Sequence, residues 1–337
     1  MANRSPGVDI PFGAGRERRD EMDPIEAFRA DGAAVAVVGA GGKKTTMYAL
    51  ANRLDRAVVT ATVRIPIFDP HVATVSVTPD PVERLERSAA GAGTAGSDAA
   101  GADAAGSETA KPNPEFPLGL VPAREREDRY LGYDRETVSR IIDSHDGPVL
   151  IKADGARTRE FKAPGESEPQ IPDAADVVVP VASVAVVGEP LTEDLVHRPE
   201  RVVDVARGAG LDVAIGDAVT PELVGTVLAS PAGGLAGVPD GACAIPLLNK
   251  VDDADAAATA REVAAVVRER MAEQRRETRD GTSLPSVPHV VLGRLVDEAV
   301  VDVVPVEDAN PVDDASSVED TSPVDDANPI DDDPPAG

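Results

Sequence analysis

Uninterrupted apolar runs recur along the chain and are separated by segments with helical periodicity. A run without alternating polar residues is typical of a strand covered on both faces, as in a parallel sheet. Strands, two of which continue into loops, are predicted at residues 33–39, 57–63, 148–157, 175–188, 242–253 and 289–295. Helices are predicted at residues 24–29, 45–54, 134–145 and 256–277. The alternation predicts an α/β fold, with a mostly parallel sheet flanked by helices.

Three polar segments interrupt or flank this pattern. Residues 1–22 are punctuated by Gly and Pro, and residues 88–115 contain a low-complexity Ala/Gly/Ser tract. From Pro305 the sequence repeats every six residues, with acidic side chains and no basic ones. Such segments cannot bury a core. We therefore predict a flexible arm (1–22), one α/β domain (23–300) with a disordered insertion, and a disordered acidic tail (301–337).

Composition narrows the possible partners and location. The net charge is −27, which disfavours nucleic acid and anionic membranes as partners. Arginines outnumber lysines by 27 to 6, which, with the acidity, we interpret as salt adaptation. The single cysteine excludes an internal disulfide. No run is apolar and long enough for a membrane helix, and the N-terminus lacks a signal-peptide core. We expect a cytoplasmic protein.

The segment VVGAGGKKTT, between the first predicted strand and its helix, is the main candidate for chemistry. Gly39 and Gly41 match the start of a dinucleotide fingerprint, but Lys44 stands where its third glycine is needed. A Walker A loop fails too, because no register supplies both its glycines and its hydroxyl. The loop still suits an anion, since backbone N–H groups and lysines converge at a helix N-terminus. We predict phosphate binding by Gly39, Gly41, Gly42, Lys43, Lys44 and Thr45. A plain tight turn is the alternative.

Two further segments follow predicted strands. Asp154 ends a buried strand as the acid of a Walker B segment does, and with Thr45 it is predicted to hold Mg²⁺. Arg157 follows at the same edge of the sheet, and both are candidate catalytic residues. Asn249, Lys250 and Asp252 form an N-K-x-D segment of the kind that reads guanine. A plain turn is the alternative interpretation of each segment. In the N-K-x-D segment, an aspartate would then cap the following helix.

Together these segments resemble the YqeC family, described as selenium-dependent hydroxylase accessory proteins. The matching motifs are VGAGGKKTT (38–46), TATVRIPIF (60–68), ADGARTREFKAPGESEPQIP (153–172), VVGEPLTEDLVHRPE (186–200) and LLNKVDD (247–253). The resemblance covers about residues 31–295 without the insertion. Lys44 departs from it, because the family has a threonine there, and Ala61, Val63 and Arg64 break its threonine run.

The resemblance implies a P-loop-like nucleotide binder that assists a molybdenum hydroxylase carrying selenium. On this basis we expect a purine nucleotide, GTP or ATP, with Mg²⁺, and a possible slow NTPase activity. The expected partner is the hydroxylase or its cofactor. A non-catalytic chaperone or carrier that binds a pterin phosphate in the same loop is the alternative.

Overall fold

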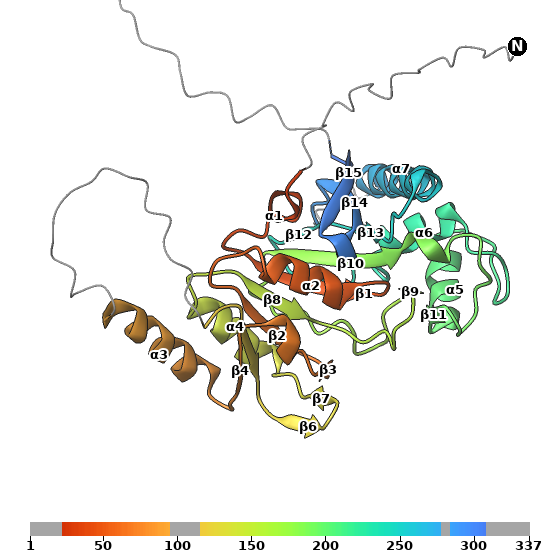
Figure 1. Cartoon of the computed structure of the whole chain (residues 1–337). Coiled ribbons are helices and arrows are strands. Elements are labelled where there is room, and N and C mark those ends of the chain that lie inside the picture. The colour runs from red at the N-terminus through yellow and green to blue at the C-terminus, as the bar shows by residue number, and fades with distance from the viewer. Residues whose placement is uncertain (1–21, 95–114, 278–283, 308–337) are drawn as a thin grey trace, which may run out of the picture. The chain divides into compact units, whose positions relative to one another are not determined.

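The computed structural model describes residues 22–94, 115–277 and 284–307. Its core is one large sheet of ten strands, shown in Figure 1. Across the sheet the strands lie in the order β15 (Ala299–Pro305), β14 (His289–Arg294), β13 (Leu247–Asn249), β10 (Val177–Ser183), β1 (Ala34–Gly39), β8 (Val149–Lys152), β2 (Val58–Ala61), β5 (Leu118–Val121) and β4 (Thr74–Val77). The tenth, β12 (Cys243–Ala244), also pairs with β10. All pairs are parallel except β14 with β15.

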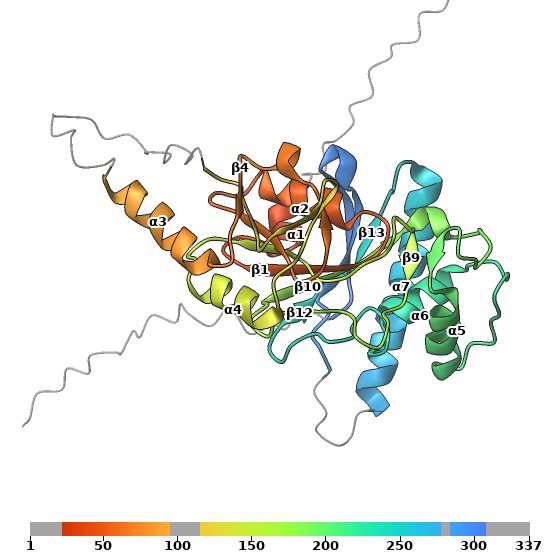
Figure 2. The same cartoon turned by 90° about the horizontal axis from the view of Figure 1, so that it is seen from below.

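Helices cover both faces of this sheet. They are α1 (Pro24–Ala27), α2 (Lys43–Ala51), α3 (Pro81–Thr94), α4 (Arg135–Asp143), α5 (Pro199–Gly208), α6 (Pro221–Leu228) and α7 (Ala254–Glu277). Val35 and Val37 of β1 face α1 and α2, whereas Ala34, one position earlier, faces α4. Helices α6 and α7 lie on the same face of the sheet as α4, where they cover β13 and β14. Figure 2 shows α2 and α4 on opposite sides of the central strands. This two-sided burial explains why the strands are apolar throughout.

Two small sheets lie outside the main one. β9 (Phe161–Lys162) and β11 (Val196–His197) form a parallel pair. β3 (Ile65–Pro66), β6 (Arg124–Arg126) and β7 (Arg129–Tyr130) form an antiparallel sheet. Single 3₁₀ turns occur at Asp69–His71, Val184–Val186 and Leu295–Asp297. These short elements follow β2, β5, β8, β10 and β14 in the chain, and they help to surround the site described below.

The predicted α/β fold with a mostly parallel sheet is confirmed, but two predicted boundaries differ. Residues 301–305, assigned to the tail, belong to β15 and pair with β14. Residues 88–94, assigned to the insertion, continue α3. The predicted disorder of 1–21, 95–114 and 308–337 concerns residues outside the described part of the chain. Within the described part, no helix is long and apolar enough to cross a membrane.

The carboxyl ends of the four central strands meet at one edge of the sheet. In the β1–β8 pair Val37 lies opposite Lys152, and in the β1–β10 pair Gly39 lies opposite Val181. Ser183, the last residue of β10, lies opposite Asn249, the last of β13. After β1 the chain continues through α2 to β2, which lies on one side of β1 in the sheet. Strands β10 and β13 lie on the other side of β1. Open α/β sheets bind ligands at such a point.

Candidate functional site

The glycine loop between β1 and α2 is packed tightly against its neighbours. Gly39, Gly41 and Gly42 have φ angles of 89°, 84° and 136°, which L side chains rarely adopt. A Cβ on Gly39 would overlap the carbonyl of Val181, and one on Gly42 would overlap the side chain of Asn249. Each glycine is therefore required by conformation and by the space around it.

Hydrogen bonds from three separate segments hold this loop. Ala40 N–H donates to the carbonyl of Val181 at 2.8 Å, and Gly41 N–H donates to that of Arg159 at 2.9 Å. The Asn249 amide donates to the Gly41 carbonyl at 2.9 Å, while its oxygen accepts from Leu295 N–H at 3.1 Å. Strand β10, the loop after β8 and the end of β13 thus fix the shape of the glycine loop.

Helix α2 begins directly after the loop without a side-chain cap. Its N-cap is Gly42, and no acidic residue lies in its first turn. The first backbone N–H groups of a helix have no partner within the helix, and together they form its positive end. Lys43, Lys44 and Thr45 provide this first turn. The arrangement gives an anion several donors and a favourable dipole.

A buried chain of charged groups lies under the loop. Asp154 is 2% exposed, and its two carboxylate oxygens lie 2.9 Å from the ammonium nitrogens of Lys43 and Lys162. The oxygen that faces Lys162 also accepts from Gly39 N–H at 2.8 Å. Lys162 continues to Glu168 at 2.8 Å, and Glu168 to Arg198 at 2.6 Å. Lys43 also donates to the carbonyl of Gly39. Asp154 therefore fastens the loop to β8 and β9.

Burial shifts the ionisation of this cluster. It lowers the pKa of Lys43, against the opposing charge of Asp154. Burial, and then the positive charge of Lys43, lowers the pKa of Lys152 to about 7. Lys152 donates to the carbonyls of Arg64 at 2.9 Å and Asp154 at 2.7 Å. Burial opposes ionisation of Glu168, but its hydrogen bonds and ion pairs with basic neighbours hold its pKa at about 2.

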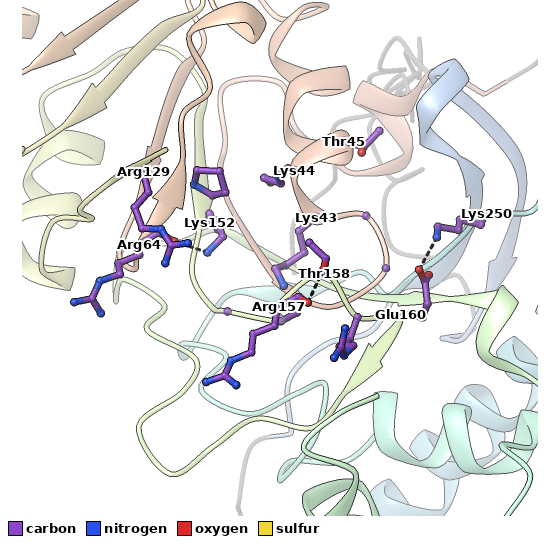
Figure 3. A pocket seen from close by; sticks show the side chains of 16 residues that line it. Lys43, Lys44, Thr45, Arg64, Arg129, Lys152, Arg157, Thr158, Glu160 and Lys250 are labelled. Atoms are coloured by element: carbon purple, nitrogen blue, oxygen red, sulfur yellow. Dashed lines mark hydrogen bonds and ion pairs between the residues drawn. The ribbon is translucent and has the colours of Figure 1, made fainter. Parts of the chain in front are cut away.

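A pocket of about 500 Å³ opens above this cluster, in front of the start of α2. Its lining is strongly basic, and Figure 3 shows these side chains arranged around it. The basic residues that line it are Lys43, Lys44, Arg64, Arg129, Lys152, Arg157, Arg159 and Lys250. Among the described residues that line it, the one carboxylate is that of Glu160. Glu160 lies with Lys250 at the end of the pocket opposite Arg64, Arg129 and Lys152.

The region that carries this site matches a known protein family. A family model described as YqeC protein matches residues 35–200. The chain belongs to the YqeC family. A comparison with curated proteins found no match. The matched stretch runs from β1 to the start of α5, so it contains the glycine loop, Asp154, Lys162 and Glu168. Membership supports a role as an accessory protein of a selenium-dependent hydroxylase.

The structure places the other residues predicted for this YqeC site in different positions. Thr45 and Arg157 line the pocket. Asn249 is buried with its amide nitrogen and oxygen both hydrogen-bonded, so in this conformation it supports the loop. Lys250 lines the pocket and pairs with Glu160 at 2.7 Å, whereas Asp252 is exposed and outside the lining. The Asn249–Asp252 stretch also lies beyond the residues that match the family model. Its role in base recognition stays a prediction.

The two predicted metal ligands do not suit Mg²⁺ equally well. A magnesium ion takes oxygen ligands with available lone pairs, commonly carboxylates together with phosphates. The Thr45 side chain is half-buried at the pocket. Asp154 lies beneath the loop, outside the lining of the pocket, and both of its oxygens face ammonium groups at 2.9 Å. In this arrangement Asp154 does not fit a metal ion.

Several pocket residues were not predicted from the sequence. Glu160 lies in the quoted segment 153–172 but was given no role there, and Arg129 lies in none of the quoted motifs; they reach the pocket through the loop after β8 and the small sheet of β7. Lys152 and Lys162 lie on either side of Asp154 and are two of only six lysines in the chain. Glu168 belongs to a segment that carries the YqeC resemblance, but its ion pairs depend on folding.

A smaller cavity of about 170 Å³ adjoins the main pocket and shares Arg157 and Arg159 with it. His197 lines it, and burial followed by the charge of Arg198 lowers the pKa of this histidine to about 4. His197 is therefore neutral near pH 7. Glu193 and Glu200 also line the cavity, so its charge is mixed.

Proposed function

We propose that this YqeC protein binds a purine nucleotide in the basic pocket and acts as a maturation factor for a selenium-dependent molybdenum hydroxylase. The observation that carries the proposal is the grouping of eight basic side chains before an uncapped helix N-terminus. This grouping occurs in a chain whose net charge is −27. A cleft lined by one sign of charge concentrates ligands of the opposite sign. A phosphate chain is the ligand that such a lining fits best.

The position of the donors supports binding of the phosphates at the loop. The free N–H groups of the first turn of α2 lie where the pocket meets Lys44 and Thr45. Arg157 and Arg159 line the same pocket, and neither guanidinium has an ion-pair partner among the described residues. Guanidinium groups bind phosphate oxygens in pairs, so both arginines are suited to a phosphate chain.

The other end of the pocket supports a nucleoside rather than phosphate alone. Glu160 is the one carboxylate among the described residues that line the pocket, and one of its oxygens pairs with Lys250. An ionised carboxylate only accepts hydrogen bonds, so it favours a ligand that brings donors to this end. Ring N–H and sugar hydroxyl groups are such donors. The pocket volume also lies within the range of nucleotide-sized ligands.

Isothermal titration calorimetry of the full chain with GTP, ATP and a pterin phosphate tests the proposal. We expect saturable binding of a nucleotide. Lys44→Ala should weaken it at least tenfold, or about 1.4 kcal/mol. The matched control Arg268→Ala removes an exposed charge of α7 outside the pocket and should leave affinity unchanged. Equal affinities in wild type and Lys44→Ala would contradict the proposal, and binding of the pterin phosphate alone would favour a cofactor carrier.

A second variant tests the nucleoside end. Glu160→Gln keeps the shape of the side chain but halves its accepting capacity. We expect it to weaken nucleotide binding severalfold while binding of inorganic tripolyphosphate stays equal or tightens, because a negative charge is removed. Equal losses for both ligands would show that Glu160 acts only on the fold of the loop.

A further inference from the structure

We propose that the pocket binds its phosphate ligand directly as a metal-free polyanion, neutralised by lysine and arginine side chains instead of a bridging Mg²⁺. This inference rests on the proposed function, because it specifies the chemical form of the ligand that the same pocket takes. It replaces the magnesium site predicted at Thr45 and Asp154. Three features of the site carry it: the contacts of Asp154, the surroundings of Glu160 and the surplus of basic side chains.

Asp154 is unavailable to a metal ion. Its Oδ1 lies 2.9 Å from the Lys43 nitrogen, and its Oδ2 accepts from Gly39 N–H and lies 2.9 Å from the Lys162 nitrogen. A metal ion at either oxygen would have to displace an ammonium group and would remain beside the second one. Like charges at such distances in a buried site repel strongly. Displacing Lys162 would also disturb its bond to Glu168.

Glu160 is the remaining carboxylate among the described residues that line the pocket, and it is a poor substitute. It already pairs with Lys250 at 2.7 Å, and the rest of the lining is basic. The potential in such a pocket repels a divalent cation and attracts an anion. A group of three or more acidic, histidine or cysteine residues able to hold a metal is also absent from the described part of the chain.

The basic side chains can neutralise the charge of a phosphate chain, as a metal ion does in other phosphate sites. Lys44, Arg157 and Arg159 line the pocket, and Arg64 and Arg129 lie at the end opposite Glu160 and Lys250. Arg157 and Thr158 have φ angles of 47° and 61°, so the loop that presents Arg157 and Arg159 holds an uncommon backbone conformation. Such strain persists where the surrounding structure enforces it, often at ligand sites.

Calorimetric titration of the full chain with GTP and with tripolyphosphate, in EDTA and in excess Mg²⁺, tests the inference. We expect both ligands to bind in EDTA at least as tightly as in Mg²⁺, because the metal removes negative charge from the ligand. A tenfold or greater loss of GTP affinity in EDTA would overturn metal-free binding and leave the nucleotide pocket intact. Failure of GTP to bind in either buffer would instead overturn the proposed function.

Thr45→Val adds a check at the predicted metal hydroxyl and retains the shape of the side chain. If Thr45 meets the phosphate only through its backbone N–H or a direct hydrogen bond, the variant changes affinity by the same factor in EDTA and in Mg²⁺. A loss confined to the Mg²⁺ buffer would mean that Thr45 holds a metal, which contradicts the inference. In a constant background of about 1 M KCl, where surface repulsion is already screened, the wild-type melting temperature should not change with added Mg²⁺, and a saturable rise would count against metal-free binding.

Discussion

Individual residues at the site have different roles from those that their motifs suggest. Asp154 has the sequence position of a metal-binding acid, yet it is the counter-ion of two buried lysines. Asn249 has the position of a base-reading residue, yet it bridges the glycine loop and Leu295. In both cases the residue type suits the prediction, but contacts formed on folding give the residue a structural role.

The ion pairs of Asp154 predict a large effect on stability. Asp154→Asn leaves the ammonium of Lys43 buried without a counter-ion, and removing one partner of a buried pair costs about 3–5 kcal/mol. Denaturant unfolding should show a loss of this order. The control Asp302→Asn breaks a partly exposed pair with Arg261 and should cost less than about 1 kcal/mol. Equal losses in the two variants would contradict the assignment.

The lowered pKa of Lys152 predicts that the affinity of the pocket for anions depends on pH. Burial and the charge of Lys43 lower its pKa to about 7, so in the free protein Lys152 loses its proton as pH rises above 7. A bound phosphate favours the charged form, and the complex therefore takes up a proton. Affinity for tripolyphosphate should fall between pH 7 and 9, by at most about tenfold per pH unit. Titrations at several pH values measure this, and the slope should vanish in Lys152→Met.

At the scale of elements, the glycine loop is shaped by the strands around it. It follows β1 and is held by β10, by the loop after β8 and by the end of β13. A Cβ on Gly41 would lie 2.6 Å from Ser183 N and 2.8 Å from the carbonyl oxygen of Glu160. The loop can therefore approach these segments only as glycine, which explains three glycines in a loop too short for a Walker A pattern.

Gly41→Ala tests this close packing against a matched control. Gly188 has a similar φ of 90° but no atom near its potential Cβ, so Gly188→Ala introduces the backbone strain alone, about 1–2 kcal/mol. Gly41→Ala should cost at least about 2 kcal/mol more, because the overlap with fixed backbone atoms adds to the strain. Chemical denaturation of both variants measures the difference. Similar losses would show that the loop can move aside.

Elements were predictable where burial leaves a clear pattern. The apolar runs predicted β1, β2, β8, β10, β13 and β14, and the helical periodicity predicted α2, α4 and α7. The antiparallel strand β15 was assigned to the acidic tail because Asp302 and nearby prolines mask its half-buried valines. The short strands β3, β6, β7, β9 and β11 have two or three residues each, too few for a periodicity to be read.

At the scale of the molecule, charge is strongly segregated. The chain carries a net charge of −27, yet eight of its 33 basic residues line one pocket. Acidic side chains elsewhere repel one another and keep the surface hydrated, whereas the pocket attracts anions. Salt should therefore act on the two regions in opposite directions: it relieves repulsion across the surface and weakens attraction in the pocket.

Salt dependence follows from this segregation. Screening lengths fall from about 10 Å at 0.1 M to about 3 Å at 1 M salt. The melting temperature should therefore rise by at least about 4 °C over this range as self-repulsion is screened. Differential scanning calorimetry in KCl measures the rise, and choline chloride should produce a similar one, since screening does not depend on the cation. A flat or falling melting temperature would contradict the role of net charge.

The sequence by itself determined the α/β class, the central strands, the anion-suited loop and the resemblance to the YqeC family. These features depend on local pattern, because burial on both faces requires apolar runs and a tight strand–helix turn requires glycine. The tertiary structure decided which side chains meet. Glu160, Lys162 and Glu168 share the segment after β8, whereas Arg129 comes from a distant one, and no spacing in the sequence encodes their arrangement around the loop. Only folding brings Lys43 and Lys162 to Asp154, and this pairing changes a predicted metal ligand into the buried anchor of the loop.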